Sequence, residues 1–242
     1  MNRQNWSGNF KFGDLWGAYV GRTSDNSAHA HAAVQVALAV GSDVSIEVED
    51  GETISAETLI VGPQIRHRLL PSSGLVTIVY VEQLSPLAAR LLETIRPKKV
   101  GAPPRSAKLA LNKNESPRSW IERVSLSLGT PAGHVDARIA TALKAAAHDG
   151  APGAVGRAAI AAGLSQARLR ALAKEQLGVP VSQLLLWRKL AAASHAIAGG
   201  ETLSASAAAG GFTDQAHMTR TMRRMLGITP ASARMPLKGS NA

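Results

Sequence analysis

The feature that most constrains the fold is a repeat in the C-terminal half of the chain. Gly163-Leu-Ser165 recurs as Gly211-Phe-Thr213, 48 positions later, and Leu177-Gly-Val179 recurs as Leu226-Gly-Ile228, 49 positions later. In each copy a hydroxyl residue that can cap a helix follows a glycine and an apolar residue, and a second glycine that can end the helix follows a leucine. Each copy therefore predicts a capped helix that begins after a tight turn.

The second copy, residues 210–230, shows the pattern of a helix that packs on one side. Thr213 and Asp214 can cap its N-terminus. The apolar side chains recur at helical spacing, namely Met218, Met222, Met225 and Leu226. The opposite face is polar and basic, with Gln215, His217, Arg220, Arg223 and Arg224. Such side chains suit a DNA major groove and its phosphates, and a solvated surface helix is the alternative interpretation.

The chain from residue 135 onward is predicted to be helical throughout. The expected helices cover 135–148, 154–162, 165–177, 181–198 and 203–209, followed by the helix of the second copy. A short helix, a turn at glycine and a longer capped helix make a helix–turn–helix unit, whose second helix enters the major groove. A connecting helix over 181–198 would be about 27 Å long. Two recognition helices could then stand about 34 Å apart, which is one turn of DNA.

Charge divides the chain into three segments. Residues 1–95 carry six Lys/Arg against ten Asp/Glu, residues 96–134 eight against two, and residues 135–242 thirteen against five, for a net charge of +10. The basic rear part is typical of a protein that binds a polyanion. We therefore predict two domains with different partners, an acidic one over 1–95 and a DNA-binding one over 135–242, joined by a basic linker with a short helix over 96–134.

The acidic front segment is predicted to be rich in strands. Short apolar runs at 34–40, 44–48, 58–61 and 76–81 are separated by turn signals, which favours a sandwich or barrel. Helices are expected at 85–95 and, in the basic segment, at 116–129, although the sequence does not say which domain the second of these joins.

Several classes of protein and site are excluded or disfavoured. The chain has no cysteine, which excludes disulfides and thiolate metal sites. No secretory signal and no apolar run of about 18 residues is recognisable, so we expect a cytoplasmic protein without a membrane segment. The absence of a phosphate loop, a Ser/His/Asp signature and a paired-carboxylate motif favours a protein that is not an enzyme.

Residues 135–242 resemble the DNA-binding domain of AraC/XylS-type transcription regulators. The segments that carry the resemblance are Gly163-Leu-Ser-Gln-Ala-Arg-Leu-Arg170, Leu177-Gly-Val-Pro180, Trp187-Arg-Lys-Leu190 and the long stretch Ala208–Arg234. The resemblance implies a sequence-specific regulator of transcription that binds double-stranded DNA, with RNA polymerase as a further candidate partner and a homodimer as a candidate assembly.

The resemblance also implies which side chains contact DNA. The early exposed positions of the two recognition helices would contact base edges, namely Gln215, Ala216, His217 and Arg220 in the second unit and Ala167, Arg170 and Ala171 in the first. Phosphate contacts are expected from Arg168, Lys174, Arg223 and Arg224. The first unit departs from the family pattern, because Ala171 and Ala173 stand where larger residues are usual. We therefore expect the second unit to contribute more of the sequence specificity.

Histidines in the front segment resemble the metal-binding motifs of cupins. His29, His31 and Gln35 approximate the first motif and Val61–His67 approximates the second, with Gln35 in place of the usual carboxylate. Alternation along a continuing strand would place His29, His31 and Gln35 on one side. Three imidazoles and an amide could hold a divalent metal such as Zn²⁺, Fe²⁺ or Mn²⁺. The resemblance implies a cupin-like sensor domain over 1–95. The alternatives are a small-molecule effector pocket lined by His29, His31, Gln35 and His67, and polar residues at a barrel mouth with no ligand.

These observations together predict an α+β chain of two domains. A cupin-like β-barrel would be followed by an all-α domain in which a long helix joins two helix–turn–helix units. The leading interpretation is a transcription regulator controlled by a small-molecule effector. The alternatives are a metal-dependent cupin enzyme with a DNA-binding tail and a basic protein that binds DNA without sequence preference.

Overall fold

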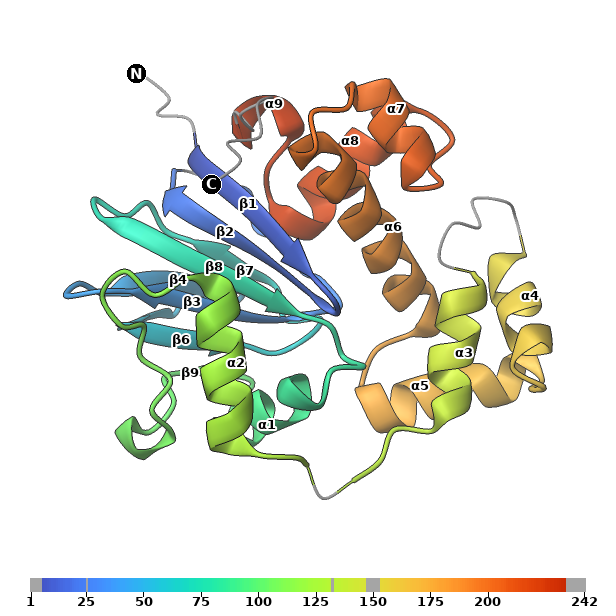
Figure 1. Ribbon diagram of the computed structural model, residues 1–242, viewed down its shortest axis with the longest axis horizontal. Coiled ribbons are helices and arrows are strands. Elements are labelled where there is room, and N and C mark those ends of the chain that lie inside the picture. The colour runs from blue at the N-terminus through green and yellow to red at the C-terminus, as the bar shows by residue number, and fades with distance from the viewer. Residues whose placement is uncertain (1–5, 25, 132, 147–152, 234–242) are drawn as a thin grey trace. The chain divides into compact units, whose positions relative to one another are not determined.

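The computed structural model describes residues 6–24, 26–131, 133–146 and 153–233 (Figure 1). The chain divides into a β-rich unit, which combines the residues up to 131 with the described residues from 222 onward, and a helical unit within residues 132–221. This confirms the predicted α+β class with two domains. Within the described ranges, no helix combines the length and the apolarity needed to cross a membrane.

The β-rich unit contains two antiparallel sheets. The larger sheet has the strand order β1-β2-β8-β3-β6-β9 and the smaller has the order β5-β4-β7. The strands are β1 (Ser7–Gly13), β2 (Trp16–Arg22), β3 (Val34–Ala39), β4 (Val44–Val48), β5 (Thr53–Ala56), β6 (Thr58–Val61), β7 (His67–Leu69), β8 (Leu75–Val81) and β9 (Val100–Gly101). The four apolar runs of the sequence form β3, β4, β6 and β8, as predicted.

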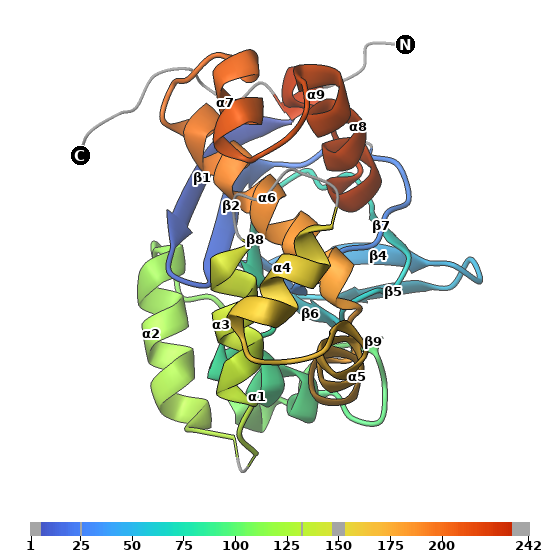
Figure 2. The same ribbon diagram turned by 90° about the vertical axis from the view of Figure 1, so that its right-hand side faces the viewer.

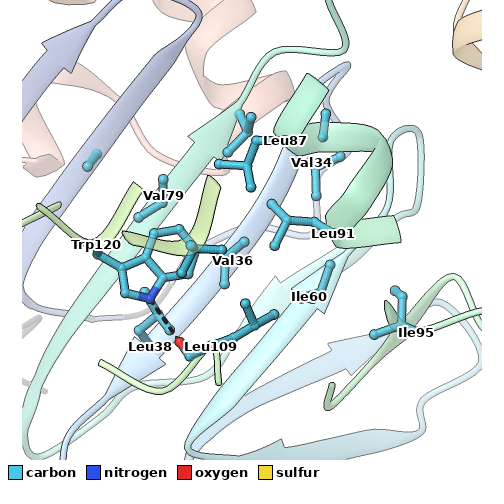
Figure 3. Packing of buried hydrophobic residues seen from close by; sticks show 14 residues of the cluster. Val34, Val36, Leu38, Ile60, Val79, Leu87, Leu91, Ile95, Leu109 and Trp120 are labelled. Carbon is cyan, nitrogen blue, oxygen red and sulfur yellow. Dashed lines mark hydrogen bonds between the residues drawn. The ribbon is translucent and has the colours of Figure 1, made fainter. Parts of the chain in front are cut away.

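Strand β3 is buried on both of its faces. Its alternate residues Val34, Val36 and Leu38 belong to a hydrophobic core that also includes residues of β6 and β8. Two helices cover this face of the sheet, α1 (Pro86–Thr94) and α2 (Pro117–Leu128), as Figure 3 shows. Because side chains alternate along a strand, Gln35 lies on the opposite face from these three residues. The strand therefore separates the helix-covered core from the interior between the two sheets.

The segment predicted as a linker contributes to this core. Leu109, Trp120 and Val124 are buried among the sheet residues, and the Trp120 indole Nε1 donates a 2.8 Å hydrogen bond to the carbonyl of Leu109 (Figure 3). Arg123 donates to both carboxylate oxygens of Glu115, at 2.7 and 2.8 Å. Residues 105–107 form the 3-10 helix η1 (Arg105–Ala107). Helix α2 thus packs on the β-rich unit, which resolves the placement that the sequence left open.

The helical unit follows the predicted order of elements (Figure 2). The helices after residue 132 are α3 (Ala137–Ala145), α4 (Ala154–Ala161), α5 (Gln166–Leu177), α6 (Val181–Ala198), α7 (Leu203–Ala209), α8 (Gln215–Leu226) and α9 (Pro230–Ala233). The end of α8, from Met222 onward, and α9 are part of the β-rich unit. The bounds of α6 and α7 agree with the predicted ranges, and the predicted C-terminal end of the first helix, at 147–148, lies outside the described residues. The buried side chains of these helices are mostly aliphatic or methionine, and Trp187 and Phe212 are buried aromatic residues among them.

Candidate functional site

The two predicted recognition helices, α5 and α8, begin at well-defined caps. The Ser165 hydroxyl accepts a 3.2 Å hydrogen bond from the Arg168 backbone N–H at the start of α5. At the start of α8 the Asp214 carboxylate accepts from the His217 backbone N–H at 2.7 Å. Of the two residues that the sequence offered as caps, Asp214 therefore makes the bond to the helix backbone. The Thr213 hydroxyl instead lies 3.5 Å from the His217 ring Nδ1.

The caps fix how the two helices correspond. Both contain 12 residues, and they start at Gln166 and Gln215, which are 49 positions apart. The residue inserted in the second copy thus lies in the turn before the helix and not inside it. The structurally equivalent pairs are Gln166 with Gln215, Ala167 with Ala216, Arg168 with His217, Ala171 with Arg220, and Lys174 with Arg223.

The side chains expected to contact DNA lie on the exposed faces of these helices. Leu169 and Leu172 of α5, and Met218 and Met222 of α8, are buried. The residues predicted to contact bases or phosphates are exposed, namely Ala167, Arg168, Arg170, Ala171, Lys174, Gln215, Ala216, Arg220, Arg223 and Arg224. His217 is half-buried, because its ring packs edge-on against Phe212 at a centroid distance of 5.3 Å. Each helix thus has one buried apolar side and one exposed polar side.

Gln166 is a candidate that the sequence prediction missed. It is exposed at the first position of α5, and its side-chain Oε1 accepts a 3.2 Å hydrogen bond from the Arg170 guanidinium. This bond between residues one helical turn apart orients both polar groups on the exposed face. The change in repeat spacing from 48 to 49 residues was the available signal, since it reveals one inserted residue. The start of α8 at Gln215 then places that residue before the helix.

The β-rich unit holds a second candidate site, a buried cluster of His29, His31, Gln35 and His67. Each of these side chains is at most 2% exposed. One ring nitrogen from each histidine lies within 4.8 Å of those from the other two. The Gln35 Oε1 atom lies 3.1 Å from His31 Nε2 and 3.3 Å from His67 Nε2. The structure therefore brings together all four residues that the sequence grouped.

The backbone that holds the cluster differs from the one we expected. Strand β3 begins at Val34, so His29 and His31 lie before it and not on a continuous strand. A bend at Ala32 and Ala33 interrupts the alternation. His29 instead forms an isolated antiparallel bridge with His67, through two backbone hydrogen bonds of 2.9 Å. This bridge brings the two motifs of the sequence together.

The hydrogen bonds of the cluster assign the tautomer of each ring. The Nδ1 atoms of His29, His31 and His67 lie 3.0, 3.0 and 2.9 Å from the backbone carbonyls of Ser27, Ala33 and Ile65. A carbonyl oxygen only accepts, so each Nδ1 carries the proton. Burial lowers the pKa of His29 to about 3 and that of His31 to about 4, and burial also lowers the pKa of His67 well below its ordinary value. At neutral pH the rings are uncharged, and their Nε2 atoms carry lone pairs.

Comparison with known proteins gives a family for the helical unit. Residues 158–235 match a family model described as a helix-turn-helix domain. This match spans both recognition helices and the helix that joins them. Residues 158–235 are a helix–turn–helix domain of the AraC type. A comparison of the whole chain with curated proteins finds no significant match.

Solved structures resemble the chain over nearly its full length. Apo ToxT K231A from Vibrio cholerae is 10% identical, covers 96% of this chain and 100% of its own, and superposes with a TM-score of 0.58. ToxT from the same organism with a bound unsaturated fatty acid is 10% identical, covers 94% of this chain and 95% of its own, and gives a TM-score of 0.54. At such low identity these likenesses show a shared fold and no more.

The Asp214 cap of α8 should contribute to the stability of the AraC-type domain. Asp214→Ala is expected to lower its free energy of unfolding by about 1 kcal/mol, because the first turn of α8 loses the side-chain acceptor for its backbone. Urea denaturation of the full-length protein, followed by circular dichroism, measures the change. Thr213→Ala serves as the matched control and should cost less, since its hydroxyl bonds to a side chain. A larger loss in Thr213→Ala than in Asp214→Ala would show that Thr213 is the cap.

Proposed function

We propose that the protein is a sequence-specific transcription regulator that places α5 and α8 in successive major grooves of double-stranded DNA. The observation that carries the proposal is the equivalence of the two helices. They have the same length, both are capped and both expose a polar face, and the 18-residue helix α6 joins the two helix–turn–helix units. Two such helices on one chain suit a site with two half-motifs about one helical turn of DNA apart.

The exposed residues divide into those that select sequence and those that supply affinity. Gln215 can bond an adenine edge through two hydrogen bonds, and Arg220 can do the same with guanine. His217 and Ala216 would contact neighbouring bases, and Gln166, Ala167 and Arg170 would do so in the first half-site. Arg168, Lys174, Arg223 and Arg224 would contact phosphates, which raises affinity for every sequence.

The second unit should contribute more to sequence selection than the first. Ala171 of α5 is the structural equivalent of Arg220, and its methyl group can offer only an apolar contact to a base. Gln166 and Arg170 are the remaining polar groups near the start of α5, and they bond to each other. The first half-site should therefore tolerate more base changes than the second.

The β-rich unit would regulate DNA binding in response to a small ligand. A ToxT structure of the same fold contains an unsaturated fatty acid, which supports a small-molecule ligand for this protein. The residues here argue for a different ligand chemistry, because the interior of the unit contains the polar cluster of His29, His31, Gln35 and His67. RNA polymerase and a second copy of the chain are the further partners that we propose for such a regulator.

Selection from a random DNA pool tests the proposal directly. The full-length protein is incubated with the pool at several salt concentrations, and the bound DNA is sequenced. We expect a motif with two half-sites about 10 base pairs apart. At physiological salt the selected site should be preferred over random DNA by about 10³-fold or more. Binding without an enriched motif would identify a general basic DNA-binding protein and would overturn the proposal.

A further inference from the structure

The turn between α7 and α8 packs directly on the connecting helix α6. Gly210 of this turn is buried, and a Cβ atom placed on it would lie 2.6 Å from the backbone oxygen of Lys189 and 2.8 Å from the Cβ atom of Ala193. The φ angle of Gly210 is −80°, which any residue can adopt. The close packing against α6, and not the backbone conformation, therefore requires a glycine here.

The side chain of Lys189 bonds to the same turn. Its Nζ atom donates a 3.1 Å hydrogen bond to the carbonyl oxygen of Gly211, the residue after Gly210. A hydrogen bond from a charged donor is about twice as strong as one between neutral groups. Lys189 is half-buried, so it is not a solvated side chain on an open helix face. Helix α6 thus contacts the turn with its backbone and also bonds to it through this side chain.

The first helix–turn–helix unit contains a turn of the same backbone structure. In both units the glycine N–H and the next N–H donate to carbonyls three and five residues earlier in the preceding helix. These two bonds form the Schellman motif, which ends a helix at a residue of positive φ. The φ angles of Gly163 and Gly211 are 64° and 67°. The two turns therefore correspond residue by residue, and the contacts that hold them can be compared.

The repeat spacing of 48 residues also aligns α3 with α6, the helices that precede the two turns. Ile139 and Ala142 of α3 are buried. Their equivalents in α6, Trp187 and Leu190, are buried as well. Since both helices bury the same face in this alignment, Thr141 of α3 corresponds to Lys189 of α6.

The two units differ at the residues that hold the turn. Ala162 stands at the position of Gly210, so the first turn carries a Cβ atom for which the second turn has no room. Thr141 stands at the position of Lys189, and its hydroxyl donates at 3.2 Å to the carbonyl of Ala137 in its own helix. The bond from the connecting helix to the turn is therefore a property of the second unit.

We propose that Lys189 is a positioning residue that fixes the orientation of α8 without contacting DNA. Gly211 lies three residues before the Asp214 cap and four before Gln215, the first residue of α8. A turn bonded to α6 thus determines where the base-contacting end of α8 points. Groups that make specific contacts must be held to within about 0.5 Å. The role in sequence selection rests on the proposed function, whereas the effect of Lys189 on the start of α8 does not.

A methionine at this position tests the role of the charged donor. Lys189→Met keeps an unbranched apolar side chain and removes the hydrogen bond to Gly211. We expect the preference for the selected DNA site over random DNA to fall by about tenfold, the effect of one charge-assisted hydrogen bond. The slope of log affinity against log salt should stay unchanged, because no phosphate contact is lost. Competition binding at several salt concentrations measures both quantities, and circular dichroism verifies that the variant is folded.

Two variants serve as controls. Lys174→Met removes an exposed lysine that is expected to contact phosphate, so it should reduce the salt slope by about 1 and leave the preference unchanged. Lys189→Arg keeps a charged donor and should retain most of the preference. The Lys174→Met result in Lys189→Met would identify a phosphate contact and overturn the proposal. An unchanged preference in Lys189→Met, or an equal loss in Lys189→Arg, would also overturn it.

Hydrogen exchange without DNA separates the proposal from the proposed function. Mass spectrometry of Lys189→Met should show about tenfold faster amide exchange in a peptide covering residues 211–218, because the turn and the start of α8 open more readily. The equivalent peptide of the first unit, residues 163–169, should be unchanged. Faster exchange in a protein that selects no DNA motif would contradict only the proposed function. Unchanged exchange at 211–218 would contradict the role of Lys189, whether or not a motif is selected.

Discussion

Replacing Gln215 and Arg220 together with alanine is expected to abolish most of the preference of the protein for its selected DNA site. A good two-bond contact between a side chain and a base contributes about 1–3 kcal/mol of discrimination. Loss of two such contacts should thus reduce the ratio of specific to random binding by about 30- to 10⁴-fold. Competition between labelled site and unlabelled random DNA at one salt concentration measures this ratio. Both residues are exposed on α8, so the fold should be preserved.

The matched control is a double variant on the same helix, Arg223→Ala with Arg224→Ala. These side chains are also exposed but lie in the last turn of α8, where phosphate contacts are expected. Their loss should weaken binding to all sequences alike and reduce the slope of log affinity against log salt by about 2. An unchanged preference in the first double variant would show that α8 is not the main recognition helix. A lost preference in the control would show that Arg223 or Arg224 contacts bases.

The helical unit could be predicted closely because its signals are local. Helix α6 agrees with the predicted range because Pro180 precedes it and Gly199 and Gly200 follow it. Where two caps competed, as at Thr213 and Asp214, the sequence offered both, and only the geometry distinguished them. The equivalence of Gln166 and Gln215 was missed for the same reason, since it depends on which residue begins α8.

The β-rich unit was less predictable because its determinants are distant in the sequence. Strands β1 and β2 were not expected, since Gly8, Gly13, Gly17 and Gly21 weaken the strand signal. The structure explains two of these residues. Gly8 pairs with Gly21, and a Cβ atom on Gly21 would lie 2.5 Å from the Gly8 Cα atom. Only glycine at both positions lets the backbones of β1 and β2 come this close. A local sequence pattern does not reveal this need, because the two residues belong to different strands.

The place of α2 and the formation of the histidine cluster also depend on contacts between residues that are distant in the sequence. The sequence predicted α2 but could not place it, because Trp120 reaches its partner, the Leu109 carbonyl, only in the folded chain. The cluster was grouped by resemblance to cupin motifs, although the alternation invoked for it fails at Ala32 and Ala33. The bridge between His29 and His67 joins residues 38 positions apart. The sequence pattern could not predict this contact.

Acid should destabilise the metal-free β-rich unit steeply. The pKa values of His29 and His31 are lowered by burial to about 3 and about 4, and that of His67 is also well below the ordinary value of about 6.5. The unfolded chain therefore binds up to three more protons than the folded chain once the pH falls below about 6.5. Stability is fully present above this pH and is lost as the pH falls toward the folded pKa values. Between pH 6 and 5 the loss should reach about 4 kcal/mol.

Urea denaturation in the presence of a chelator, followed by tryptophan fluorescence, measures this loss. The hydrogen bond from Arg123 also lowers the pKa of the Glu115 carboxyl from its ordinary value of about 4.5. The stability that this carboxylate contributes is lost mainly below that pH, outside the window from pH 6 to pH 5. His67→Gln removes one of the three titrating rings and should reduce the dependence on pH by about a third. Equal stability at pH 6 and pH 5 in the parent would show that the rings become protonated without unfolding. Burial would then not hold the imidazoles in their neutral form in this range of pH.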